Sequence, residues 1–183
     1  MKDALAIHRM LLERETLHEI VRLPQLIANA DELPKALGLP PERCLATRVH
    51  LVTTGGLLPG GRGSRYLTAV ALSAGSQVPA DVLRSALGVR SVKPASADAI
   101  NNATDYAAEL VAPLLLGDIP VFIDRRVVDS LDLDEVVYTA TGEPSTALGI
   151  RILDLMAICH AKPIDLTGSP VTRTWRRAGS GLR

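Results

Sequence analysis

The sequence has few aromatic residues and few cysteines, and both shortages restrict what the protein can be. Aromatic side chains make up 3% of the 183 residues, so we expect an aliphatic core and no broad surface for stacking single-stranded bases. The two cysteines, Cys44 and Cys159, each stand in an apolar stretch. Two isolated thiols do not make a disulfide framework, which favours a reducing, cytoplasmic environment.

The chain also has no excess of charge of either sign. It contains 20 Lys+Arg and 20 Asp+Glu, so no global field draws a polyanion to the surface, and a nucleic acid would have to bind a local patch. Near the amino terminus, Asp3 and the charged residues after His8 interrupt every apolar run. We therefore predict neither a signal peptide nor a membrane partner.

The common motifs of enzyme chemistry are missing. The four histidines are far apart in the sequence and no Cys-x-x-Cys pair occurs, so we predict no metal site and no cofactor. There is no nucleophile elbow and no helix-turn-helix pattern, and we predict no DNA partner. The glycine-rich stretch 55–64 is followed by neither a Lys-Ser pair nor a helix, so it predicts a hairpin loop. An enzyme built on this chain would work by positioning and by backbone donors.

Apolar periodicity and capping residues predict an alternation of short helices and strands. Helices are expected at 4–15, 29–38, 79–87, 96–104 and 152–160, with a helical turn at 127–131. Strands are expected at 18–23, 44–53, 66–73, 90–93, 121–124, 135–139, 147–151 and 163–166. This order predicts an α+β (mixed α/β) single domain over residues 1–168, with a twisted, mostly antiparallel sheet flanked by helices. Residues 169–183 form a basic tail that we expect to be flexible.

Two stretches could carry a site. Along the strand 44–53 side chains alternate, so Ala46, Arg48 and His50 share one face, which is either exposed to solvent or part of a site. The stretch 101–120 is an apolar loop with a few polar residues that ends at Pro120. It could line a pocket, or it could be a buried crossover whose polar residues cap the preceding helix.

The order of these pieces resembles the YbaK family of aminoacyl-tRNA deacylases, which includes the editing domains associated with prolyl-tRNA synthetase. The resemblance extends to about residue 168. It is carried by Leu37-Gly38-Leu39, the strand 66–73, Ala86-Leu87-Gly88, Thr104-x-Tyr106 with Pro113, Val121-Phe122-Ile123-Asp124, and Thr141-Gly142 before Asp154-Leu155.

The resemblance implies a trans-acting editing enzyme that hydrolyses the ester joining a wrong amino acid to a transfer RNA. In typical members the pocket lies between the sheet and the 101–120 loop. A lysine on the second strand holds the substrate, a glycine-containing loop presents backbone amides to the aminoacyl carbonyl, and water attacks. The implied partners are the acceptor end of aminoacyl-tRNA and, in addition, an aminoacyl-tRNA synthetase.

This sequence departs from the family pattern at the chemically important positions. Ala46 stands in place of the lysine, followed by the matching Thr47, and Asp105, Glu109 and Leu110 stand in place of glycines. Loss of the cation and of close backbone approach removes transition-state stabilisation. The resemblance thus implies a site, with its usual chemistry altered.

Three interpretations remain open. The pocket could be rebuilt, with Arg48 in the role of the lysine and Asp105 or Glu109 binding the substrate ammonium group or orienting water. The domain could instead be catalytically inactive and bind transfer RNA or protein, with Arg62, Arg65 and the tail arginines contacting phosphates. It could also be an interaction domain whose carboxylates meet a cation. For the first, the candidate catalytic residues are Arg48, Thr104 and Asp105, and the candidate substrate-binding residues are Ala46, Thr47, His50, Tyr106, Glu109, Pro113, Thr141 and Gly142.

Overall fold

The computed structural model describes residues 1–55, 63–132 and 134–168. Most of the predicted hairpin loop, including Arg62, lies outside the described residues, and so does the predicted basic tail. None of the helices in the described ranges combines the length and apolar character that a membrane crossing requires.

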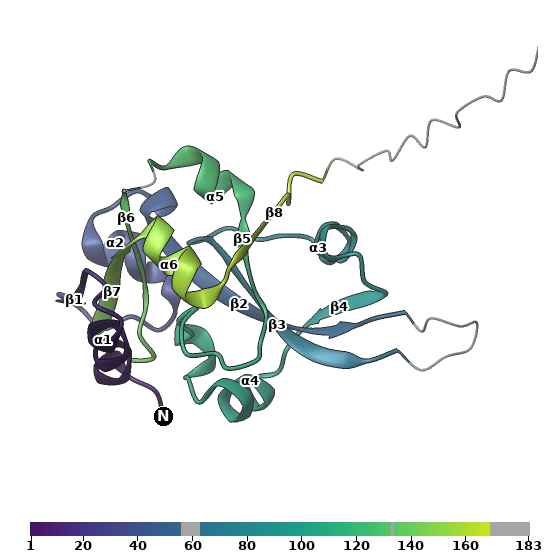
Figure 1. Ribbon diagram of the computed structural model, residues 1–183, viewed down its shortest axis with the longest axis horizontal. Coiled ribbons are helices and arrows are strands. Elements are labelled where there is room, and N and C mark those ends of the chain that lie inside the picture. Colours follow the sequence, from purple (N-terminus) through teal and green to yellow (C-terminus); the bar gives the residue numbers. More distant parts are fainter. Residues whose placement is uncertain (56–62, 133, 169–183) are drawn as a thin grey trace, which may run out of the picture.

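One eight-stranded sheet organises the described residues (Figure 1). Its strands are β1 (His18–Arg22), β2 (Cys44–Thr53), β3 (Arg65–Ser73), β4 (Ser91–Pro94), β5 (Val121–Asp124), β6 (Val136–Ala140), β7 (Thr146–Arg151) and β8 (Lys162–Ile164). The strand order is β1-β7-β6-β2-β3-β5-β8, and β4 pairs with β2. Four pairings are antiparallel and three are parallel. The predicted mixed, mostly antiparallel sheet is therefore confirmed.

The helices are short and lie in the predicted stretches, although α1 ends two residues before its predicted end and the predicted helix 29–38 begins as a 3-10 turn. They are α1 (Ala4–Glu13), α2 (Leu33–Leu37), α3 (Ala80–Leu87), α4 (Ala97–Thr104), α5 (Arg125–Ser130) and α6 (Ile152–Cys159), with 3-10 turns at Ala30–Glu32, Pro41–Arg43 and Ala108–Leu110. Gly38 and Gly88 end α2 and α3 in the left-handed conformation. The helical turn predicted at 127–131 begins two residues earlier, because the Asp124 side chain caps it. The last strand ends at Ile164, two residues before its predicted end.

Helices cover both faces of the sheet, and the alternation along β2 decides what each face contacts. The odd-numbered Leu45 and Val49 join the main apolar cluster, which also contains residues of α1, α6 and the 105–116 loop. The even-numbered Cys44 and Ala46 pack with α2, and Val52 packs with Leu83 of α3. On the even face, Arg48 and His50 stand between the last two clusters, so polar side chains separate two apolar regions.

The edge of β2 that faces away from β3 is paired only at its ends. β6 pairs in parallel with Cys44 and Leu45, while β4 pairs antiparallel with residues 50–53 (Figure 1). Residues 46–49 have a registered partner strand only on the β3 side among the described residues. The sheet is therefore open at the middle of β2.

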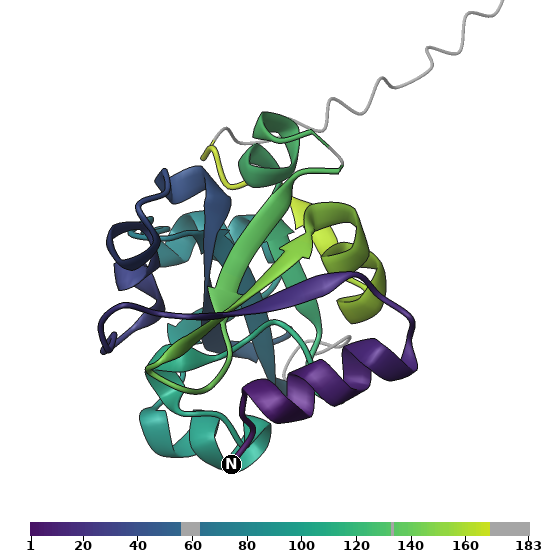
Figure 2. The same ribbon diagram turned by 90° about the vertical axis from the view of Figure 1, so that its left-hand side faces the viewer.

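The 105–116 loop is mainly a buried connection. Tyr106, Val111, Ala112 and Leu114 are at most 1% exposed and belong to the main apolar cluster. The amino-terminal segment packs against this loop, beside α1 (Figure 2), and the Lys2 ammonium donates hydrogen bonds to the carbonyls of Thr104 and Leu115. Most of this stretch is therefore the buried crossover that was one of the two alternatives. The short turn at Ala108–Leu110 fits the other alternative, a pocket-lining loop, because Ala108 and Glu109 line a cavity beside β2.

Candidate functional site

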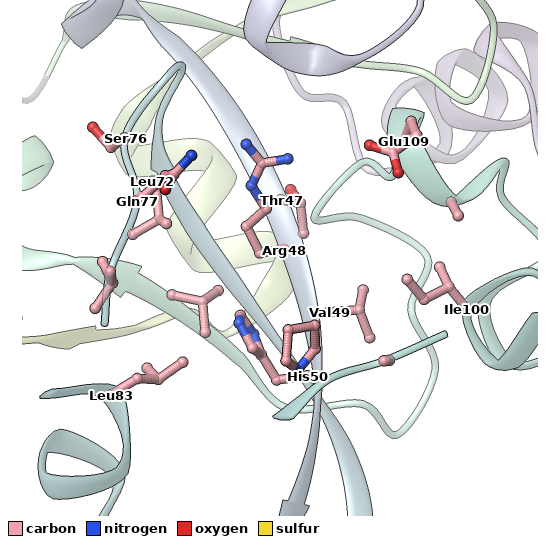
Figure 3. A pocket seen from close by; sticks show the side chains of 15 residues that line it. Thr47, Arg48, Val49, His50, Leu72, Ser76, Gln77, Leu83, Ile100 and Glu109 are labelled. Carbon is pink, nitrogen blue, oxygen red and sulfur yellow. The ribbon is translucent and has the colours of Figure 1, made fainter. Parts of the chain in front are cut away.

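A cavity of about 300 Å³ opens where β2 lacks its second neighbour. Its walls are β2 and β3, the start of α3 with the residues before it, the end of β4, and the 3-10 turn after α4 (Figure 3). This volume lies at the small end of the range of ligand pockets. The hollow expected between β2 and the 104–113 segment therefore exists, and four predicted site residues line it: Thr47, Arg48, His50 and Glu109.

Arg48 is held in place by an acid from a distant part of the chain. Its guanidinium forms an ion pair with Asp31, and both side chains are about one third exposed. The other carboxylate oxygen of Asp31 accepts a hydrogen bond from the backbone N–H of Gly75 at 2.7 Å. Only one guanidinium nitrogen contacts Asp31, so the remaining donors of this planar group can bind a carbonyl or a phosphate.

His50 lies further along the same face of β2 and is neutral at pH 7. Burial lowers its pKa below the usual value of 6.5. A hydrogen bond with the Arg48 backbone opposes this shift, and the charge of Arg48 adds to it. Its Nδ1 atom is buried and has no hydrogen-bond partner among the described residues. The neutral ring can therefore act as a hydrogen-bond donor or acceptor, but not as a cation.

Thr47 presents its backbone to the open edge. In an antiparallel pair, the N–H and C=O of one residue point to the same side, and the side alternates along the strand. The carbonyl of Val49 accepts a hydrogen bond from Ala95, beyond the end of β4, so the backbone groups of Thr47 point to that side too. The Thr47 hydroxyl is also buried and has no partner among the described residues. The backbone groups of Thr47 can therefore meet a ligand at the gap, whereas its hydroxyl is enclosed.

Glu109 lies across the cavity from Arg48 (Figure 3). It is exposed and forms no ion pair within the described part of the chain. A guanidinium and a carboxylate on opposite walls can bind a ligand that carries a negative group and an ammonium group. The closed, dry network expected of a pure interaction domain, with Glu109 or Asp105 paired with Arg48 or His50, is not formed, because Arg48 pairs with Asp31.

Three of the other predicted site residues surround the end of α4 and do not line the cavity. Thr104 is fully buried, and its hydroxyl donates to the carbonyl of Ile100 and accepts from the N–H of Tyr106. Asp105 ends the helix at φ 60°, and its exposed carboxylate lies 3.2 Å from the Met1 amino group. Tyr106 is buried and donates its hydroxyl proton to the carbonyl of Leu114. These groups hold the loop together.

The remaining four are buried away from the cavity. Ala46 packs in the apolar cluster around α2. Pro113 lines a second cavity of about 270 Å³, between the end of α1 and the end of α6. The Thr141 hydroxyl lies 2.6 Å from that of Thr146, and Gly142 contacts Lys2 and Tyr106. Four of the predicted site residues thus line the cavity, and the other seven lie elsewhere in the fold.

Sequence reasoning missed the residue that orients Arg48. Asp31 lies in the predicted helix 29–38, and in the structure it is in the 3-10 turn capped by Asn29. Sequence spacing gives no signal for its second role, because the contact joins a 3-10 turn to a strand. It also missed the apolar wall from α3 and its preceding residues, Val78 and Leu83.

The described residues offer no conventional nucleophile and no metal cluster. Burial raises the pKa of Cys44 and of Cys159 to about 11, so both remain thiols at neutral pH. No group of three or more His, Cys, Asp or Glu side chains is placed to bind a metal ion within residues 1–55, 63–132 and 134–168.

Comparison with known proteins shows which family and which solved structures this chain resembles. Residues 25–158 match the family described as the aminoacyl-tRNA editing domain. No curated protein sequence matches the chain significantly. Among solved structures, the hypothetical protein APE2540 is 17% identical, with a TM-score of 0.69 over 86% of this chain and 97% of that one. A protein described as a candidate trans-editing enzyme for prolyl tRNA synthetase is 18% identical, with a TM-score of 0.67 over 87% of this chain and 93% of that one. At these identities the two structures show a shared fold.

Proposed function

The chain belongs to the aminoacyl-tRNA editing domain family, and from this premise we propose that it hydrolyses the ester of a mischarged transfer RNA. The observation that carries the proposal is the cavity at the open edge of β2, with Arg48 and Glu109 on opposite walls. The end of an aminoacyl-tRNA carries an ammonium group beside the ester and phosphates further along the chain. The ammonium group is complementary in charge to Glu109, and the phosphates are complementary to Arg48.

In the proposed reaction, Glu109 binds the substrate ammonium group and Arg48 contacts the aminoacyl carbonyl or the nearest phosphate. Water adds to the carbonyl carbon, the bond to the ribose oxygen breaks, and a proton passes to that oxygen. Negative charge develops on the carbonyl oxygen, where the guanidinium and the Thr47 backbone N–H can stabilise it. Asp31 contributes by fixing the guanidinium. This activity would reside in the cytoplasm, with a synthetase as a further partner.

The test is deacylation of a panel of misacylated transfer RNAs by the purified full chain. We expect hydrolysis of at least one substrate, and we expect Arg48→Ala to slow it at least about tenfold, or about 1.4 kcal/mol of transition-state stabilisation. Glu109→Gln should raise KM more than it lowers kcat, because it removes a substrate contact. Arg9→Ala, an exposed arginine on α1, is the matched control and should leave the rate unchanged.

The second candidate is a catalytically inactive module that binds transfer RNA. Two observations favour it: Ala46 supplies no cation on β2, and Asp31 already neutralises part of the Arg48 charge. The same panel separates the two functions. Salt-sensitive binding of the acceptor end without turnover above buffer would establish the module and exclude the hydrolase.

A further inference from the structure

The gap along β2 leaves both backbone groups of Thr47 without a partner in the described part of the chain. They point away from β3, because they share the direction of the Val49 carbonyl, which accepts a hydrogen bond from Ala95. The pairing with β6 stops at Leu45, and the pairing with β4 starts at His50. Buried backbone groups are almost always hydrogen-bonded, and Thr47 is 6% exposed and lines the cavity. A ligand at the gap can supply the missing partners.

The gap has room for a single residue of an extended chain. Leu45 is paired with β6, and the Val49 carbonyl is bonded to Ala95. These two residues of β2 are separated by about 13 Å along an extended strand. Between them, Thr47 is the residue whose N–H and C=O both point into the gap. A unit with one donor and one acceptor, spaced as in one amino acid, therefore fits, whereas a longer strand does not.

We propose that Thr47 is a specificity-determining residue, whose backbone binds the aminoacyl group of the substrate as if it were one residue of an antiparallel strand. The substrate ammonium group donates to the Thr47 carbonyl as well as to Glu109, and the aminoacyl carbonyl accepts from the Thr47 N–H. The proposal rests on the proposed function and names its substrate class: esters of L-α-amino acids that carry a free ammonium group.

This mode of binding selects the handedness of the amino acid. Residues directly opposite each other in an antiparallel pair project their side chains to the same face, so an L-residue opposite Thr47 points to the face of Val49. On that side the cavity is lined by Val49 and Ile100, which belong to one apolar cluster (Figure 3). A D-residue that kept both hydrogen bonds would point to the other face, where Arg48 pairs with Asp31. An apolar side chain there would take water from a charged group.

The test measures binding of the alanyl amide of 3′-amino-3′-deoxyadenosine, which cannot be hydrolysed as an ester, to the full chain by calorimetry. The L-alanyl and D-alanyl forms are the matched pair. We expect the L form to bind at least about tenfold more tightly, because the D form must give up a hydrogen bond or approach Arg48. Thr47→Pro removes the N–H at a position where a sheet tolerates proline, and it should abolish most of the preference. Thr47→Val keeps the N–H and should keep the preference.

A measurement on the wild type decides the matter if Thr47→Pro does not fold. Saturation with the L-alanyl compound should move the amide proton resonance of Thr47 downfield and slow its exchange with solvent, because the N–H gains an acceptor. The N–H of Arg48 points toward β3 and pairs there with Val70, so its resonance should change much less.

The outcomes separate this inference from the hydrolase proposal. A preference for the L form together with the shift at Thr47 supports the inference even if no misacylated transfer RNA is hydrolysed, which would leave a binding module. Equal binding of the two forms, a preference that survives in folded Thr47→Pro, or an unchanged Thr47 resonance overturns the inference even if hydrolysis occurs. Absence of binding of both forms overturns the inference together with the proposed pocket.

Discussion

At the scale of single residues, the candidate site depends on polar side chains set among apolar ones. Arg48 and His50 occupy positions on β2 where an aliphatic residue would have joined two apolar clusters into one. Polar residues at core-facing positions reduce stability, and functional sites are where such residues are typically retained. The candidate site therefore coincides with a break between two apolar clusters.

Burial of His50 predicts how stability depends on pH. Its pKa is lower in the folded protein than the usual 6.5, so the unfolded chain binds a proton more readily. This contribution to stability is present above pH 6.5 and is lost as the pH falls through the lower, folded-state pKa. We expect chemical denaturation at pH 7.5 and pH 5.5 to show a smaller loss of stability on acidification for His50→Asn than for the wild type. An equal loss in both proteins would show that His50 does not contribute.

Some predicted site residues do not line the cavity, and they show which structural relations the sequence does not predict. Strand alternation placed Arg48 and His50 on one face of β2, because that relation depends only on spacing. Asp105 was a candidate because its carboxylate, in place of a loop glycine, could bind an ammonium group or orient water, but at φ 60° it ends α4 and its carboxylate lies near the Met1 amino group instead. Glu109, four residues later in the next 3-10 turn, lines the cavity. The direction of a side chain after a helix end is set by tertiary packing, which the local sequence does not encode.

At the scale of elements, the amino-terminal segment, the 105–116 loop and the turn before β7 meet at Gly142. This residue has φ 93°, and a Cβ atom there would overlap the Lys2 carbonyl oxygen and lie 2.8 Å from Cδ1 of Tyr106. Its N–H donates to the carbonyl of Leu110 at 2.9 Å. The close approach of the Lys2 backbone explains why this position needs a glycine.

We therefore expect Gly142→Ala to be much more destabilising than a comparable change elsewhere. Gly88→Ala is the control, since Gly88 also has a positive φ, 65°, but nothing lies within 4 Å of a Cβ there. The control should cost about 1 kcal/mol from backbone strain, and Gly142→Ala about 1–3 kcal/mol more from overlap. Urea denaturation measures both. Equal costs would mean that the neighbouring backbone moves aside freely.

Most elements could be predicted because their signals are local. Ser96 accepts a hydrogen bond from the N–H of Ala99 at the start of α4, and Gly38 and Gly88 end two helices, as their positions indicate. The strand order could not be predicted, because β6 and β4 share one edge of β2 although they are far apart in the sequence. The cavity is a consequence of that order, so its position was predicted from family resemblance and not from local pattern.

At the scale of the whole molecule, the balanced charge limits how a nucleic acid can be bound. With 20 basic and 20 acidic residues, attraction must come from a few well-placed cations. Lys93 is exposed on β4, directly before Pro94, which lines the cavity. Arg65 is exposed at the start of β3, opposite Thr53. Both lie on strands that border the cavity, so the proposed function makes them candidates for phosphate contacts.

We expect Lys93→Gln to weaken binding of transfer RNA and to reduce the slope of log K against log salt by about 1, the effect of one lost phosphate contact. Lys162→Gln is the control, because Lys162 is exposed on β8, the edge strand that β3 and β5 separate from β2 and the cavity. Filter binding at several salt concentrations gives both slopes. An unchanged slope for Lys93→Gln would place the phosphates elsewhere.

The gap in strand pairing along one edge of β2 makes the width of the cavity adjustable without changing the residues that line it. β6 ends its pairing at Leu45, and β4 begins its pairing at His50, so the aperture is bounded by two independent strand ends. Lengthening either strand by one residue pair would narrow the entrance, and shortening it would widen the entrance, while Arg48 and Glu109 kept their places. A fold of this kind can thus acquire a different preference for substrate size through insertions and deletions in the flanking connections.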